Sequence, residues 1–203
     1  VEMPLPFAAQ APGAISIGSL SKSFWGGLRI GWVRAPQELV DACFRARLSL
    51  DLGAALLEQL VAVELLADPG DVLAERRRLL RESRTAAVGA LAEHLPDWRV
   101  PSTHGGLTLW CELPEALSTA LALAAEPHGV LLAAGPAFAP EGGYDRYLRI
   151  PLTLPAEVLV DAVRRLVTAW DDARSGRPPA EPVRGVVPSS GRLPQRDRKS
   201  VVA

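Results

Sequence analysis

The most informative stretch of this chain is Gly18-Ser19-Leu20-Ser21-Lys22-Ser23-Phe24-Trp25-Gly26-Gly27-Leu28-Arg29-Ile30-Gly31. Three serine hydroxyls surround the amine of Lys22, and the glycine pair predicts a turn that lets Arg29 approach the same place. A guanidinium donates two parallel hydrogen bonds to a phosphate, and hydroxyls add short ones. Because a lysine amine can form a Schiff base with an aldehyde, the loop predicts a covalently held cofactor that carries a phosphate.

The basic residues are almost all arginine: there are 20 Arg and only two Lys, Lys22 and Lys199. Arginine therefore serves nearly every position that needs only a positive charge. A lysine kept among serines marks a position that needs an amine able to lose its proton, which a guanidinium cannot do.

Strands and helices alternate around this loop. The apolar run Ala14–Leu20 predicts a short strand, and Leu28–Val33 predicts a second strand after the turn. Residues 1–13 contain three prolines and predict a connecting segment without regular structure. Apolar residues at helical spacing predict two helices between residues 38 and 66, and one long helix over Asp71–Leu95.

The second half of the chain continues the alternation. It predicts strands at Trp98–Val100, Leu107–Leu113, Val130–Ala133 and Tyr147–Pro151, and helices over Pro114–Glu126 and Pro155–Asp172. Strands separated by helices predict an α/β fold. Within the last of these strands, alternation puts Tyr147, Arg149 and Pro151 on one face, and Leu148 and Ile150 on the other.

Composition limits the class of protein. The 203 residues are 48% hydrophobic and 22% charged, with a formal net charge of -1, which argues against wholesale disorder and against a global nucleic-acid-binding charge. No apolar run is long enough to cross a membrane. Cys43 and Cys111 stand far apart and predict neither a disulfide nor a metal site, so a reducing, cytoplasmic setting is expected.

Residues 173–203 differ from the rest of the chain. From Arg174 to Ala203 there are seven basic and two acidic residues, together with five Pro and three Gly. The segment lacks aromatic residues and a helical pattern. It therefore predicts a disordered, solvated extension rather than a nucleic-acid-binding arm.

The loop also carries a resemblance to a known family. Ser19-Leu20-Ser21-Lys22, with Arg29 seven positions after the lysine, resembles the pyridoxal-phosphate attachment loop of fold-type I, class I/II aminotransferases. The run from Trp25 to Pro36 is most similar to the MocR subgroup of GntR-type transcription regulators, which carry an aminotransferase-like domain behind a winged helix-turn-helix. The resemblance runs from about Ile15 to Trp170 and includes Gly105-Gly106-Leu107, Gly129–Phe138 and Tyr147–Pro151.

This resemblance implies roles for five residues. Lys22 would hold pyridoxal 5'-phosphate as a Schiff base and move a proton of the substrate, while Ser19, Ser21 and Arg29 would bind the cofactor phosphate. Arg149 would clamp the carboxylate of an amino acid or other amine ligand. The family also implies a homodimer, and contact with DNA only through a winged-helix domain that is absent from these residues.

The resemblance further implies a division into four parts. Residues 1–35 would be the C-terminal end of the large cofactor-binding domain, 36–67 connecting helices, 68–172 the complete small C-terminal α/β domain, and 173–203 the tail. The chain begins shortly before the lysine loop, so the family's aspartate for the pyridine nitrogen and its glycine-rich phosphate turn would lie upstream. We therefore expect this polypeptide alone to be a poor enzyme, and prone to instability or association because neighbouring strands are missing.

The resemblance leaves two functions open. The MocR-like residues favour the aminotransferase-like domain of a regulator, which either transaminates or only senses an amino acid, and the alternative is a fragment of a stand-alone metabolic aminotransferase.

Two other motifs carry less weight. Residues 19–22 also fit the Ser-x-x-Lys motif of penicillin-binding serine hydrolases, but the required Lys-Thr-Gly element is missing. His104 precedes a glycine pair without any Gly-x-Ser-x-Gly elbow elsewhere in the sequence, so we expect it to be a turn residue.

Overall fold

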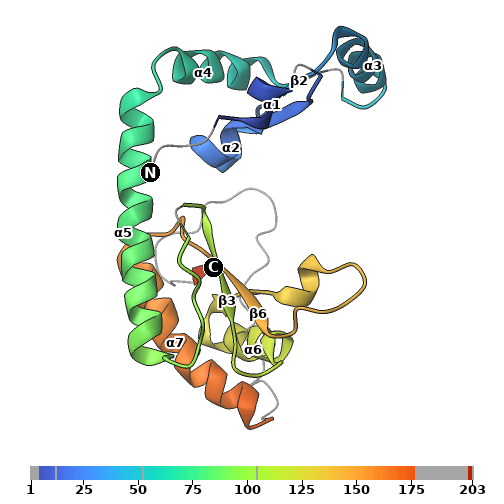
Figure 1. Cartoon of the computed structure of the whole chain (residues 1–203). Helices are drawn as coiled ribbons and strands as arrows, with labels where there is room; N and C mark the ends of the chain where they lie inside the picture. Colours follow the sequence, from blue (N-terminus) through green and yellow to red (C-terminus); the bar gives the residue numbers. More distant parts are fainter. Residues whose placement is uncertain (1–4, 12, 52, 104, 177–200, 203) are drawn as a thin grey trace. The chain divides into compact units, whose positions relative to one another are not determined.

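The computed structural model describes residues 5–11, 13–51, 53–103, 105–176 and 201–202 (Figure 1). The chain divides into two compact units, Val1–Arg78 and Leu79–Ala203. The boundary falls inside the long helix α5 (Gly70–His94), which corresponds to the helix predicted over residues 71–95. Each unit contains its own cluster of buried apolar side chains.

The first unit is built on a β-hairpin. Strands β1 (Ser16–Ser19) and β2 (Gly31–Arg34) pair antiparallel, with Ser16 opposite Arg34 and Ser19 opposite Gly31. The closed end of the hairpin contains a helical turn, α2 (Leu20–Ser23), and a 3-10 turn, η1 (Gly26–Leu28). The prediction that the second strand begins at Leu28 was wrong, because the Leu28 side chain is buried in η1 against Leu20.

The segment before the hairpin also differs from its prediction. Residues Phe7–Gln10 form a single helical turn, α1, although the prolines of residues 1–13 predicted no regular structure. The turn begins directly after Pro6, which takes the N-cap position with φ -56° and ψ 145°.

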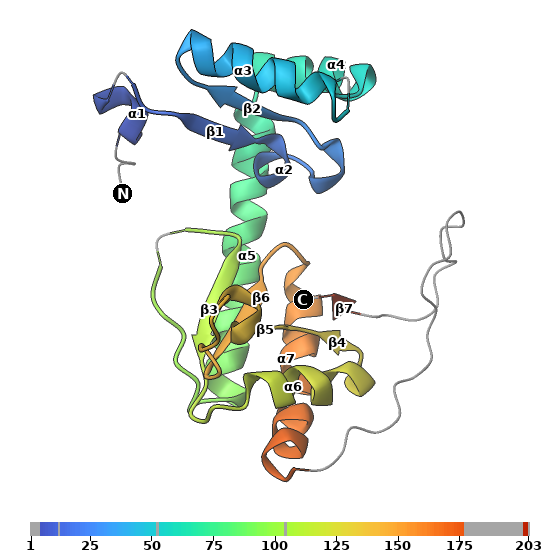
Figure 2. The same cartoon turned by 90° about the vertical axis from the view of Figure 1, so that its right-hand side faces the viewer.

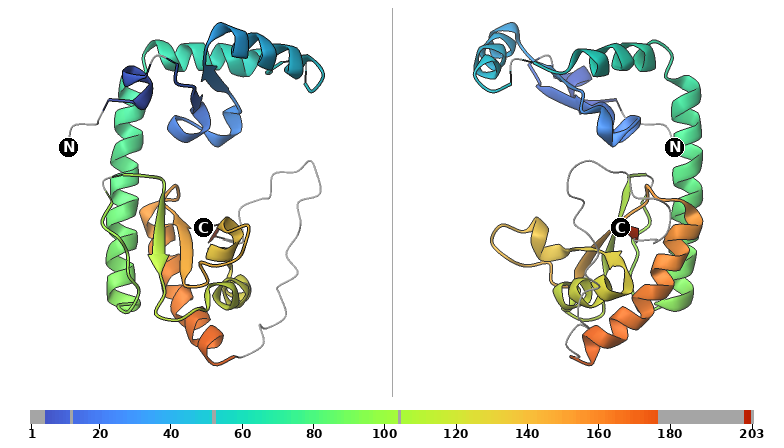
Figure 3. Two further views of the ribbon diagram at one scale, coloured as in Figure 1. Left: turned by 45° about the vertical axis from the view of Figure 1, so that its right-hand side comes forward. Right: turned by 180° about the vertical axis from the view of Figure 1, so that it is seen from behind.

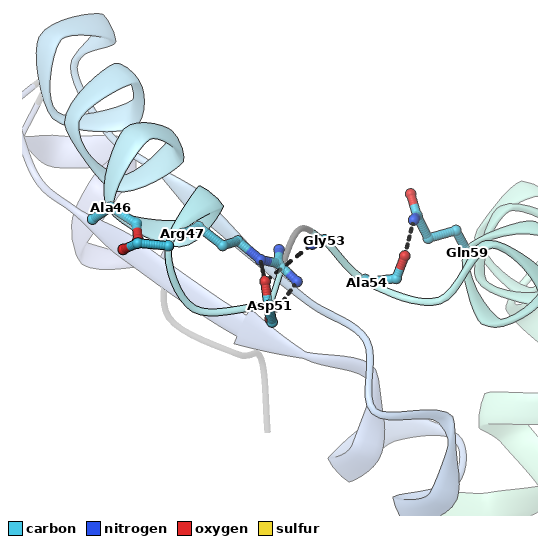
Figure 4. A network of polar contacts seen from close by, with 7 residues as sticks. Ala46, Arg47, Asp51, Gly53, Ala54 and Gln59 are labelled. Carbon is cyan, nitrogen blue, oxygen red and sulfur yellow. Dashed lines mark hydrogen bonds and ion pairs between the residues drawn. The ribbon is translucent and has the colours of Figure 1, made fainter.

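Two helices follow the hairpin, as predicted. They are α3 (Gln37–Leu48), which begins directly after Pro36, and α4 (Leu56–Ala67). Figure 4 shows the polar contacts that order the connection between them. Arg47 donates to both carboxylate oxygens of Asp51 at 2.7 and 3.1 Å, and Asp51 also accepts a hydrogen bond from the Gly53 backbone N–H at 3.1 Å. The hydrogen bonds from Arg47 lower the pKa of the Asp51 carboxyl below its usual value.

Much of the apolar surface of the first unit is exposed. Neither α3 nor β2 has a buried residue, and α4 has one, Ala62. Large side chains such as Ile17, Trp32 and Leu57 are 79%, 50% and 74% exposed. Exposed apolar side chains in this number are typical of faces that pack against other protein.

The second unit contains a three-stranded antiparallel sheet in the order β3 (Thr108–Glu112), β6 (Tyr147–Pro151) and β5 (Ala133–Ala134). Its remaining elements are α6 (Ser118–Ala125), η2 (Glu126–His128), β4 (Val130–Leu131), η3 (Gly135–Phe138), α7 (Ala156–Arg174) and β7 (Val201–Val202), the last paired parallel with β4. Helices and strands are thus mixed as expected, with an antiparallel main sheet.

Helices cover one face of this sheet. The buried side chains of β3 and β6, including Leu109, Leu148 and Ile150, pack in one cluster with residues of α7 and of α5 after residue 86. Figure 2 shows α5 and α7 on the same side of the sheet. Trp98 and Trp170 meet edge to face inside this cluster, with ring centroids 5.6 Å apart.

Several predicted boundaries in this unit were wrong for tertiary reasons. The helix expected from Pro114 begins at Ser118, because the N–H groups of Leu113 and Ser118 donate to carbonyls of Arg146 and Asp145 in a distant loop. The strand expected at residues 130–133 is broken into β4 and β5, and the strand expected at 98–100 is reduced to one bridge, Arg99 with Glu112.

The last helix, α7, extends two residues beyond its predicted end, to Arg174. Most of the tail, residues 177–200 and 203, lies outside the described residues, as does His104. No helix in the described ranges is long and apolar enough to span a membrane.

Candidate functional site

Ser19, Ser21 and Lys22 come together in one turn of the first unit. Ser19 is the last residue of β1 and caps α2, and its Oγ accepts a hydrogen bond from the Ser21 backbone N–H at 3.3 Å. Lys22 lies in the last turn of α2 and is exposed, while Ser21 is half-buried. The chain therefore leaves strand β1 and presents two hydroxyls and an amine within four residues.

Arg29 stands on the segment that closes the same end of the hairpin. It directly follows η1 and adopts the left-handed conformation, with φ 52° and ψ 23°. On either side of it, Leu28 is buried and the carbonyl of Ile30 accepts a hydrogen bond from the Leu20 N–H at 3.0 Å. The backbone thus ties the arginine segment to the lysine turn, while the Arg29 side chain remains exposed.

The lysine turn is supported from beneath by a small apolar cluster. Leu20, Leu28 and Ala62 are 3%, 2% and 5% exposed and pack together, with Phe24 and Ile30 partly buried against them. Leu20 and Leu28 come from the two halves of the hairpin end, and Ala62 comes from α4. Their burial fixes the backbone from which the polar side chains project.

The charge around this turn suits an anion. Residues 14–37 contain Lys22, Arg29 and Arg34 but no Asp or Glu. Within the described ranges, no carboxylate forms an ion pair with Lys22 or Arg29. Two hydroxyls, a guanidinium and an amine without a neutralising acid match the donors that a phosphate-bearing aldehyde requires.

Arg149 lies in the second unit on the central strand of the sheet. The burial pattern of β6 confirms the predicted alternation, since Leu148 and Ile150 are buried and Arg149 is exposed on the opposite face. Its neighbours across the ladder are Trp110 on β3 and Ala133 on β5. The guanidinium carbon lies 4.9 Å from the ring centroid of Phe138.

An aromatic cluster adjoins this arginine through Phe138 and Trp110, and the sequence patterns did not predict it. The ring of Trp110 meets Phe138 and Tyr144 edge to face at 5.5 and 5.8 Å and stacks on Tyr147 at 5.5 Å. The sequence patterns give no binding role to Trp110 or Phe138. The only local signal was Gly135-Pro136, a turn that starts η3 just before Phe138.

Other features of the described residues carry no comparable chemistry. A shallow apolar hollow lies beside the hairpin, lined by Trp32, Cys43 and Phe44 among others, but by none of the predicted site residues. Nowhere in the described ranges do three or more His, Cys, Asp or Glu side chains gather as metal ligands would.

Comparison with known proteins supports the family resemblance. The family model for "Aminotransferase class I and II" matches residues 2–166. The 2-aminoadipate transaminase of Thermus thermophilus is 35% identical over 160 residues, which are 76% of this chain and 40% of that protein. An uncharacterized HTH-type transcriptional regulator of Bacillus subtilis, YdfD, is 31% identical over 140 residues, 66% of this chain and 28% of that protein.

A solved structure shows the same relation in three dimensions. The crystal structure of LysN, the α-aminoadipate aminotransferase of Thermus thermophilus complexed with N-(5'-phosphopyridoxyl)-L-leucine, superposes with a TM-score of 0.78 at 31% identity. The alignment covers 86% of this chain and 48% of that one. This chain therefore spans less than half the length of these relatives, and its fold is part of an aminotransferase fold. Because the family model covers most of the sequence, the chain belongs to the class I and II aminotransferase family.

Proposed function

We propose that this protein is an amino-acid aminotransferase in which Lys22 binds pyridoxal 5'-phosphate covalently. The observation that carries the proposal is the turn at Ser19–Lys22, where an exposed amine and two hydroxyls stand in an acid-free stretch tied to Arg29. Proteins of this family use pyridoxal phosphate.

Each residue of the turn has a definite task in this proposal. The guanidinium of Arg29 and the hydroxyls of Ser19 and Ser21 would hold the phosphate by donating hydrogen bonds to it, so that the Lys22 amine could react with the aldehyde. Once the substrate's own amine had displaced it from the aldehyde carbon, the Lys22 amine would be free to act as acid and base, removing a proton from the substrate's α-carbon and returning one at a different atom. When bound, the cofactor supplies an electron-accepting ring.

Arg149 is proposed to bind the carboxylate of the substrate. An exposed guanidinium with no ion-pair partner in the described ranges is available for bidentate hydrogen bonding. Lys22 and Arg149 belong to different units. The proposal that both residues act on one substrate molecule therefore rests on the family resemblance. Because this chain spans 40% of the length of the Thermus enzyme, the reaction is proposed for the whole protein.

The main test is chemical. The full-length protein is incubated with pyridoxal phosphate, reduced with borohydride and digested, and the modified peptide is identified by mass spectrometry. We expect the label on Lys22 and its loss in Lys22→Arg. Lys199 is the control, since a label found there and absent from Lys22 would refute the proposal.

A second arm tests the phosphate donors. Ser21→Ala should weaken cofactor binding roughly tenfold, because it removes one hydrogen bond to a charged group. Ser23→Ala is the matched control from the same helical turn and should change the affinity by less than about twofold. If Ser21→Ala and Ser23→Ala change the cofactor affinity equally, Ser21 does not bind the phosphate.

A regulator remains the second candidate. The sequence alone favoured the MocR subgroup, and the similarity to YdfD supports that interpretation over a shorter stretch than the one matched by the transaminase. The two functions are separated by turnover. A full-length protein that carries a winged-helix segment, binds the cofactor and converts no amino acid to its keto acid would be the regulator.

A further inference from the structure

The position of Arg149 in the sheet leaves its side chain one direction in which to lean. Residues directly opposite one another in adjacent strands have side chains on the same face. On the β3 side that neighbour is the bulky Trp110, and on the β5 side it is Ala133, which has only a methyl group. Strand β5 leads directly into η3, which ends at Phe138. The guanidinium lies over the Phe138 ring, 4.9 Å from its centroid.

This contact is compatible with carboxylate binding. A guanidinium is planar, and its N–H donors point outward within that plane. A ring on one face of the plane attracts the cation without using any of those donors. A carboxylate can therefore accept two parallel hydrogen bonds at the edge while the ring holds the face.

Phe138 is itself held in place by its surroundings. The ring of Trp110 meets it edge to face, with centroids 5.5 Å apart and an interplanar angle of 83°. The turn η3 closes with a hydrogen bond from the Ala139 N–H to the Pro136 carbonyl at 3.1 Å. Gly135 permits the close approach of η3 to the next segment, since a Cβ there would lie 2.8 Å from the Tyr147 carbonyl oxygen. Figures 1 and 3 show η3 and the following loop projecting from the sheet on the side away from α5.

We infer that Phe138 is a positioning residue, which orients the Arg149 guanidinium so that its fork meets the substrate carboxylate. The inference rests on the proposed role of Arg149 in binding the substrate carboxylate. It adds Phe138, to which the proposed function gave no role. Trp110 contributes by fixing the orientation of the Phe138 ring through their edge-to-face contact. Loss of the Phe138 ring should therefore weaken the binding only of ligands that accept hydrogen bonds from both arms of the Arg149 guanidinium.

The experiment uses the full-length, cofactor-loaded protein and two probes of one shape, 4-methylpentanoate and 4-methylpentanamide, measured by calorimetry. Phe138→Leu keeps apolar bulk and removes the ring. It should weaken carboxylate binding roughly two- to fivefold and leave amide binding unchanged. Phe138→Tyr restores a ring face and should restore the carboxylate affinity.

Tyr144→Leu is the matched control. It removes a ring from the same aromatic cluster, but Tyr144 contacts Trp110 and Tyr147 rather than Arg149. It should leave the preference for the carboxylate unchanged. An equal loss in Tyr144→Leu and Phe138→Leu would overturn the inference, because the effect would then be general packing.

A third variant separates this inference from the proposed function. Arg149→Lys keeps the charge but removes the planar fork, and should weaken carboxylate binding more than Phe138→Leu does. If Arg149→Lys weakens binding and Phe138→Leu does not, the role of Phe138 fails alone. If neither weakens carboxylate binding, the carboxylate role of Arg149 fails and the inference fails with it.

Discussion

Replacing Arg29 by glycine should stabilise the hairpin end and weaken cofactor binding at the same time. Arg29 has φ 52° and ψ 23°, in the left-handed region where a side chain clashes with the following carbonyl. That conformation costs roughly 1–2 kcal/mol for a residue with a Cβ, and glycine avoids the cost while losing roughly 0.5–1 kcal/mol through its freer unfolded chain. Arg29→Gly should therefore be more stable than Arg29→Ala by about 1 kcal/mol.

The comparison of these two variants isolates the backbone from the guanidinium. Both lack the side chain that we assign to the phosphate, so both should bind pyridoxal phosphate roughly 10- to 100-fold more weakly than the unmodified protein. Stability is measured by urea unfolding without cofactor, followed by the fluorescence of Trp25 and Trp32, which flank the turn. Affinity is measured by absorbance titration.

Two results would refute this reasoning separately. Equal stability of Arg29→Gly and Arg29→Ala would mean that Arg29 carries no backbone strain. Unchanged cofactor affinity in Arg29→Ala would mean that the guanidinium does not bind the phosphate, whatever the backbone does. A residue that keeps a strained conformation and is replaceable without functional loss would contradict the view that strain is retained where it serves a site.

Two further predictions concern the second unit. Leu121→Ala should lower the free energy of unfolding by about 2–5 kcal/mol, because Leu121 is fully buried in α6. Leu123 lies on the same helix but is 55% exposed, so Leu123→Ala should change the free energy of unfolding by less than about 0.5 kcal/mol. Equal effects of the two substitutions in urea unfolding would contradict the described packing. Burial raises the pKa of the Cys111 thiol from 9.0 to about 12, so its contribution to stability is complete below pH 9 and is lost as the pH rises toward 12. Stability should accordingly fall between pH 9 and 11 more steeply in the unmodified protein than in Cys111→Val, and parallel pH profiles would show that Cys111 titrates normally.

The elements with strong periodicity were predictable from the sequence. Strand β6 has the predicted limits, because Leu148 and Ile150 alternate with polar or half-exposed neighbours and no long-range contact is needed to define them. The helices α3, α4 and α7 were predicted for a similar reason, since proline precedes α3 and α7 and apolar residues recur along them. The serines and lysine of the α2 turn were also recognisable, because their chemistry lies in consecutive residues.

What the sequence concealed depends on contacts between distant residues. Leu28 and Ile30 alternate with polar residues as in a strand, but Leu28 is buried by Leu20 and Ala62, so a 3-10 turn replaces the start of the strand. Phe138 gained a candidate role only when β5 and β6 paired and brought η3 beside Arg149. The four-part division of the chain and the roles of the site residues stay predictions.

The small cluster beneath the lysine turn implies that the position of the Lys22 amine depends on a residue without any reactive group. Ala62 stands 40 positions after Lys22, in a helix that carries none of the proposed chemistry, yet its methyl group fills the space under Leu20 and Leu28. A larger side chain at position 62 would push Leu20 and Leu28, and with them the backbone that carries Lys22, away from α4. Glycine at this position would leave a cavity beneath the lysine turn. Substitutions at Ala62 in α4 should therefore shift the Lys22 amine while leaving Lys22 itself unchanged.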